Sequence, residues 1–119
     1  MPPTAPPTSP LGRPIRLAVL ISGGGTTMLN LLTEIEQRRL DAEIVQVISS
    51  RATVAGVDRA RAAGLPCEIV TRQSFTSTAE FSDAIFARCR ARQVDLVICG
   101  GFLAMLTIPA DFQLRVMNI

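Results

Sequence analysis

An apolar run that ends in three consecutive glycines constrains the fold of this chain more than any other feature. Residues 17–21 are uniformly apolar, which is typical of a strand buried on both faces of a sheet. The sequence Ser-Gly-Gly-Gly follows, and Thr26 and Thr27 can then cap a helix whose apolar positions recur at helical spacing. We therefore expect a strand, a glycine-rich turn and a helix N-terminus in direct succession.

This succession is in principle an anion-binding site. Glycines let backbone N–H groups approach a ligand closely, and the helix N-terminus adds unpaired donors and the positive end of its dipole. The alternative is a tight turn that binds nothing, although three glycines are more than a turn needs. We expect phosphate to bind at the following residues: Gly23, Gly24, Gly25, Thr26 and Thr27.

The neighbouring residues narrow the kind of anion. Met28 stands where the dinucleotide fingerprint has its third glycine. Residues 49–51 read Ser-Ser-Arg, where an acidic residue would hold a ribose, and the chain has no lysine for a Walker P-loop. A phosphorylated small molecule therefore suits the turn better than a dinucleotide or ATP.

Composition bounds the remaining functions. The 119 residues suffice for one small domain or half of a larger one, and 48% of them are hydrophobic. A net charge of +2 is too small to favour nucleic acid, and no apolar run is long enough for a membrane span. Cys67, Cys89 and Cys99 lack metal-like spacing, so we expect no metal site, reduced thiols and a cytoplasmic location.

Residues 1–15 and 16–119 differ in pattern. The first segment is a proline-rich leader that we expect to be disordered. Beyond it, strand and helix patterns alternate. Strands are expected at 17–21, 42–48, 66–71, 95–99 and 116–119, and helices from 26, at 54–63, from the capping box at 77–80, and from 109 to about 114.

This alternation predicts an α/β fold with an open, mostly parallel, Rossmann-like sheet whose fifth strand begins as the 119 residues end. Ligands of such sheets bind beyond the carboxyl ends of the strands. A second glycine turn, Gly100-Gly101, follows the fourth strand. If the first and fourth strands are neighbours, the two glycine turns flank one crevice.

An apolar cluster follows this second turn. It is formed by Phe102, Leu103, Met105 and Leu106, and it is either core filling or the wall of a pocket for a flat apolar group. We expect Cys99, just before the turn, to be a core residue rather than a nucleophile.

Four stretches together resemble the phosphoribosylglycinamide formyltransferase family. They are LISGGGTTMLNLL, VISSRATVAGVDRARAAGLP, DLVICGGFLAMLTIP and VMNI, in the family's order and spacing. The resemblance covers residues 16–119 and only the N-terminal, phosphate-binding half of such an enzyme. It implies transfer of a formyl group from 10-formyltetrahydrofolate to the amine of glycinamide ribonucleotide, in de novo purine biosynthesis.

The resemblance also implies site residues. Gly25, Thr26 and Thr27 would contact the ribonucleotide phosphate. Asn118 matches the asparagine of the family's Asn-x-His-Pro-Ser motif, which helps polarise the formyl carbonyl and bind folate. The folate pocket would be lined by Leu103, Ala104, Met105 and Leu106.

The chain departs from the family pattern at several points. Thr26-Thr27 replace a common Ser-Asn pair, and Ala104 and Thr78 stand where folate-contacting arginines are often found. The motif's histidine and a later aspartate are absent, so we expect the 119 residues alone to be inactive and to self-associate. The alternatives are a formyltetrahydrofolate deformylase, a methionyl-tRNA formyltransferase, or a non-catalytic phosphate-binding module.

Overall fold

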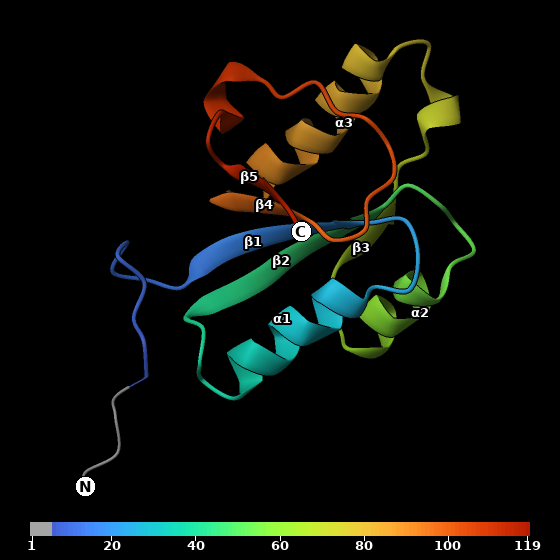
Figure 1. The fold of residues 1–119 in the computed structure, drawn as a ribbon. Helices are drawn as coiled ribbons and strands as arrows, with labels where there is room; N and C mark the ends of the chain where they lie inside the picture. Colours follow the sequence, from blue (N-terminus) through green and yellow to red (C-terminus); the bar gives the residue numbers. More distant parts are fainter. Residues whose placement is uncertain (1–5) are drawn as a thin grey trace, which may run out of the picture.

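Five parallel strands form one sheet in the computed structural model, which describes residues 6–119 (Figure 1). The order across the sheet is β3-β2-β1-β4-β5, so the first and fourth strands are neighbours as predicted. The strands are β1 (Ile15–Ile21), β2 (Ala42–Ser49), β3 (Cys67–Ile69), β4 (Leu96–Cys99) and β5 (Val116–Asn118). The predicted Rossmann-like α/β class is therefore confirmed.

Helices cover both faces of the sheet. Helices α1 (Thr26–Glu36) and α2 (Ala55–Ala62) lie on one face, and α3 (Thr78–Ala91) lies on the other (Figure 1). Two single turns of 3₁₀ helix, Arg72–Ser74 and Ala110–Phe112, complete the architecture. No helix among the described residues is long and apolar enough to cross a membrane.

Strand β1 is buried on both faces, as its unbroken apolar sequence predicts. Ala18 and Leu20 pack toward α3, in a cluster with Phe81, Ile85 and Phe86 of that helix. The alternate side chains of β1 (Leu17, Val19 and Ile21) pack with Met28 of α1 and Ala60 of α2. The two clusters hold the sheet between the helix layers and fix the direction in which the carboxyl end of β1 leaves the core.

Local backbone geometry shortens some predicted elements. The helix predicted from Pro109 to about Leu114 is only the turn Ala110–Phe112, because Gln113 takes an extended ψ of 134° that ends it, and Leu114 follows with a left-handed φ of 63°. The capping box of α3 is half formed. Ser77 Oγ accepts the N–H of Glu80 at 3.1 Å, but the Glu80 carboxylate accepts from Thr76 rather than from the N–H of Ser77.

The predicted leader lies partly outside the described residues, which begin at Pro6. Residues 6–14 contain no helix or strand, and Ile15 already belongs to β1. Two contacts join this segment to the domain. The N–H of Ser9 donates to Asp41 Oδ2 at 2.8 Å, and the Arg13 guanidinium donates to both oxygens of Asp95 at 2.6 and 2.9 Å.

The ionised carboxylate of Asp95 makes the folding stability of the chain depend on pH. Hydrogen bonds from Arg13 and from the backbone N–H of Arg16 lower the pKa of Asp95 from 3.8 to about 2, although burial opposes them. This stabilisation is complete above the ordinary pKa and is lost as pH falls from about 4 to about 2. We expect Asp95→Asn to lower the melting temperature at pH 6, and this difference from the wild type to shrink toward pH 2.

The control is Asp83→Asn, which removes an exposed carboxylate of α3 that has no ion pair among residues 6–119. Its difference from the wild type should not follow this pH profile. A deficit of Asp95→Asn that is as large at pH 2 as at pH 6 would contradict the assignment.

Gln46 of β2 is a local defect of the core. Its side chain is fully buried, and neither polar atom of its amide has a hydrogen-bond partner among the described residues. Such burial costs about 1–3 kcal/mol. We expect Gln46→Met, which keeps the length of the side chain, to raise the free energy of unfolding in urea by about 1 kcal/mol or more. The same change at exposed Gln37 should have an effect within about 0.5 kcal/mol.

Candidate functional site

The two glycine turns meet at the carboxyl edge of the sheet, as predicted. Strands β1 and β4 pair in parallel, with Leu20 opposite Cys99, and each strand leads directly into its turn. A Cβ atom at Gly100 would lie only 2.8 Å from the Cβ of Thr27, so glycine is required for this approach. Residues 23–27, Gly100 and Gly101 line one crevice of about 150 Å³.

Residues 23–27 bring five backbone N–H groups to this crevice. Among residues 6–119, none of them donates a hydrogen bond to another protein group. The prediction that Thr26 or Thr27 caps α1 is wrong. The N-cap is Gly25, with a left-handed φ of 74° and no side-chain capping bond, so the chain turns into the helix without a side-chain cap. Consecutive free donors at a helix N-terminus form an anion-binding concavity.

Helix α2 donates hydrogen bonds to the carbonyl groups of this loop, a feature that the sequence did not indicate. The N–H of Gly56 donates to the carbonyl oxygen of Gly23 at 3.0 Å, and a Cβ atom at Gly56 would lie 2.5 Å from that oxygen. Arg59, one turn further along α2, donates from Nη1 to the carbonyl oxygen of Gly24 at 2.7 Å. The loop carbonyls are thus held by α2, and its N–H groups are left free.

The close approach of Gly56 makes a specific prediction about stability. Glycine to alanine in a helix usually stabilises by about 0.5–1 kcal/mol. Here we expect Gly56→Ala to lower the free energy of unfolding by about 1–3 kcal/mol, because the new methyl group would overlap the carbonyl of Gly23. Gly23→Ala is the matched control, since a Cβ atom there meets nothing within 4 Å. A Gly56→Ala variant as stable as the wild type would contradict this packing.

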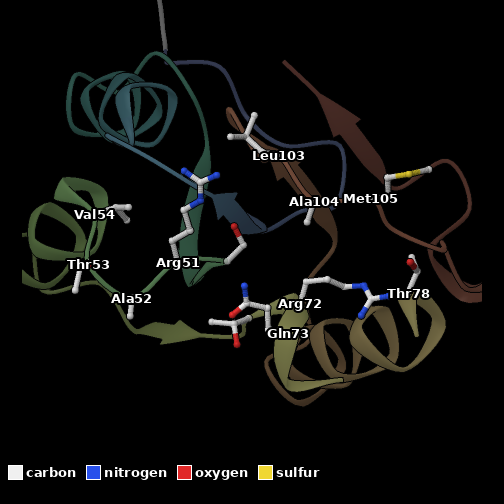
Figure 2. A pocket seen from close by; sticks show the side chains of 12 residues that line it. Arg51, Ala52, Thr53, Val54, Arg72, Gln73, Thr78, Leu103, Ala104 and Met105 are labelled. Carbon is white, nitrogen blue, oxygen red and sulfur yellow. The ribbon is translucent and has the colours of Figure 1, made fainter. Parts of the chain in front are cut away.

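A larger cavity of about 810 Å³ lies at the same edge of the sheet (Figure 2). Its lining comes from the loop after β2, the turn after β3, the start of α3 and the segment after the second glycine turn. The residues are Ser50, Arg51, Ala52, Thr53, Val54, Thr71, Arg72, Gln73, Thr78, Leu103, Ala104 and Met105. Thr78 and Ala104, the two positions at which the resemblance implied arginines, therefore border one cavity.

The apolar segment after Gly101 has both of the roles that its sequence left open, since some of its residues line the pocket and others pack against the core. Leu103 and Met105 line the cavity and are 71% and 81% exposed. Phe102 and Leu106 pack instead against the core cluster under α3, and Phe102 stacks on Phe81 with ring centroids 6.3 Å apart. The segment is anchored by the N–H of Leu103, which donates to Ser22 Oγ at 2.9 Å. Leu106 is thus half-buried against the core cluster and does not line this cavity.

The charge of the larger cavity is positive. Its lining includes Arg51 and Arg72 and no acidic residue, and neither arginine has an ion pair in the part of the chain that the structure describes. Arg72 is held by a hydrogen bond from Nη1 to the carbonyl oxygen of Phe75 at 3.0 Å. Unpaired guanidinium groups beside an apolar wall favour an anionic ligand that also carries apolar surface.

Asn118 lies at the same edge but apart from both cavities. It ends β5, pairs in register with Cys99 of β4, and is exposed. It lines neither the crevice nor the larger cavity. Its backbone is fixed by the neighbouring N–H of Ile119, which donates to the carbonyl oxygen of Cys99 at 3.0 Å.

The cysteines are poor nucleophiles. Cys99 is buried, as expected of a core residue, and burial raises the pKa of its thiol. Burial also raises the pKa of Cys89 to about 12. Among residues 6–119, no group of three or more histidine, cysteine, aspartate or glutamate side chains is placed to hold a metal ion. The polar groups that this edge offers to a ligand include backbone hydrogen-bond donors and two guanidinium groups.

Comparison with known proteins places this architecture in a family. The family model described as formyl transferase matches residues 15–119, which includes every element that forms the site. The chain belongs to the formyl transferase family.

Individual relatives agree. The chain is 32% identical over 106 residues to phosphoribosylglycinamide formyltransferase of Haemophilus influenzae. The aligned region covers 87% of this chain and 50% of the relative. It is 35% identical over 94 residues to the human trifunctional purine biosynthetic protein adenosine-3, and this alignment covers 79% of this chain and 9% of that protein. The crystal structure of glycinamide ribonucleotide transformylase 1 from Symbiobacterium toebii superposes with a TM-score of 0.83 at 33% identity, covering 90% of this chain and 51% of that one. The chain thus spans about half the length of the single-function relatives.

Proposed function

We propose that this chain forms the substrate-binding half of an enzyme that transfers a formyl group from 10-formyltetrahydrofolate to the amine of glycinamide ribonucleotide. The observation that carries the proposal is the row of free N–H groups at residues 23–27, which faces the second glycine turn in one crevice. Family membership and the names of the relatives support the same reaction.

The crevice suits the ribonucleotide phosphate. A phosphate dianion accepts several hydrogen bonds at once, and consecutive backbone donors at the start of α1 offer them without a lysine. The hydroxyl groups of Thr26 and Thr27 can donate in addition, as the serine and asparagine of the common family pattern would. Glycine at 23, 24 and 25 removes the side chains that would keep a phosphate away from the backbone.

The larger cavity suits the folate cosubstrate. Its volume of about 810 Å³ is within the range of pockets that hold ligands of this size. Leu103 and Met105 offer an apolar wall to a flat pteridine ring, and Ala104 lies between them. Arg51 and Arg72 offer guanidinium partners to the carboxylates of the folate tail, which Thr78 and Ala104 cannot do.

Formyl transfer needs control of charge and protons. The amine nitrogen attacks the formyl carbon, the bond from that carbon to the folate nitrogen breaks, and a proton of the amine ends on the folate nitrogen. We assign the polarisation of the formyl oxygen to the amide of Asn118. Since these 119 residues contain no histidine, we propose that they bind both ligands but turn over only with proton-transfer groups from outside this sequence.

Two further expectations remain predictions. We propose that the exposed apolar side chains around β5 promote self-association of the 119-residue chain; they are Leu114, Met117 and Ile119. The cytoplasmic location is also a prediction, to which the free thiols of Cys67, Cys89 and Cys99 contribute.

Gly25→Val tests the phosphate site. Valine at a φ of 74° is strained, and its Cβ would lie 3.0 Å from Met28 Cε and 3.2 Å from Gly56 Cα, so the loop must move. We expect calorimetry to show at least a roughly tenfold weaker binding of glycinamide ribonucleotide, the equivalent of one charge-assisted hydrogen bond.

Gly12→Val is the matched control, because Gly12 has a φ of 73° but lies in the segment before β1 with nothing within 4 Å of a Cβ. Circular dichroism checks that each variant folds. Should Gly25→Val fail to fold, Thr26→Ala, an exposed change, replaces it, with an expected loss of about threefold or more. A folded variant that binds glycinamide ribonucleotide as the wild type does would contradict the proposed site.

A further inference from the structure

We propose that Arg59 is a positioning residue, whose guanidinium holds the glycine loop in the conformation that presents its N–H groups to phosphate. This inference rests on the proposed function of the loop. It assigns a role to α2, which contributes no residue to the crevice itself.

The geometry begins with two successive carbonyl groups. The oxygen of Gly23 accepts from the N–H of Gly56, and the oxygen of Gly24 accepts from Arg59 Nη1 at 2.7 Å. In a planar trans peptide the N–H points opposite to the C=O of the same unit. Since these carbonyls are directed to Gly56 N–H and to the Arg59 guanidinium, the N–H of Gly24 points away from Gly56, and the N–H of Gly25 points away from the Arg59 guanidinium.

This constraint matters because of the loop's composition. Three glycines have more backbone freedom than any other three residues, and a loop free to rotate would lose its aligned donors most of the time. Ordering it when the ligand arrives would weaken binding. A contact that fixes the peptide planes beforehand therefore strengthens the site without touching the ligand.

Within residues 6–119, Arg59 has no other side-chain partner that explains its position. Its side chain is exposed, and no carboxylate lies within 4.0 Å of its guanidinium among residues 6–119. The hydrogen bond that its side chain makes in the described part of the chain goes to a residue 35 positions away, in the loop. A cation on this carbonyl also polarises the peptide and strengthens the N–H of Gly25 as a donor. The positive charge stands beside a site that has no lysine.

The test compares three variants of α2. Arg59→Gln removes the charge and the fork of donors, Arg59→Lys keeps the charge, and Arg61→Gln makes the same change two residues away, at an exposed side chain with no hydrogen bond to the loop. Glycinamide ribonucleotide and inorganic phosphate are the probes, with affinity measured by calorimetry. The amide resonances of Gly24 and Gly25 are followed by NMR without ligand.

We expect Arg59→Gln to lower the affinity for both probes by about tenfold, the equivalent of one charge-assisted hydrogen bond. It should also shift or broaden the resonances of Gly24 and Gly25, while the melting temperature stays within a few degrees of the wild type. Arg59→Lys should recover part of the affinity, and Arg61→Gln should match the wild type within about twofold, as for a surface change.

The outcomes separate the two proposals. Wild-type protein that binds neither probe would overturn the proposed function of the loop, and this inference with it. Wild-type binding that Arg59→Gln leaves unchanged, with unmoved resonances of Gly24 and Gly25, would overturn only the role of Arg59. Equal weakening by Arg61→Gln would also overturn that role, because it would reduce the effect to general charge.

Discussion

The parallel pairing of β1 with β4 is the constraint on which the rest of this structure depends. Both strands are packed between two helix layers, so the burial of their side chains fixes their neighbours and their register. The pairing of Leu20 with Cys99 brings the two glycine turns to the same height at the carboxyl edge. Gly100 can then approach Thr27 as closely as it does only because it has no side chain. The crevice follows from the core rather than from the loops.

Most of the fold could be predicted because its signals are local. The apolar run of β1, the helical spacing in α3 and the alternation of elements each occupy adjacent residues, and parallel topology then limits the possible arrangements. The errors of prediction lie at helix ends, where the backbone angles of a single residue decide where the helix begins or stops. Gln113 has an extended ψ that ends a predicted helix, and Gly25 takes the N-cap position that was assigned to a threonine. Residue type alone does not determine such angles.

The residues of the candidate site likewise divide into those that the sequence could predict and those that it could not. The glycine loop could be found in the sequence because its residues are consecutive. Gly56 and Arg59 could not, since their contacts join segments more than thirty residues apart, and nothing in their own neighbourhood marks them. Arg72 is a similar case, as its place in the cavity follows from the turn after β3. A charge has a role at a site only through the fold that brings it there.

A phosphate site made of backbone amides without lysine must meet two opposed requirements. Close approach of the ligand needs glycine, but glycine gives the loop the freedom that aligned donors cannot have. A lysine can follow its ligand on a flexible stem, whereas a peptide N–H acts only in the direction that its plane allows. Rigidity must therefore come from outside the loop. In the phosphate site that we propose, this rigidity comes from α2, where the N–H of Gly56 and the guanidinium of Arg59 bind the two carbonyls that set those planes. The glycine loop and the start of α2, remote in sequence, thus act as one unit.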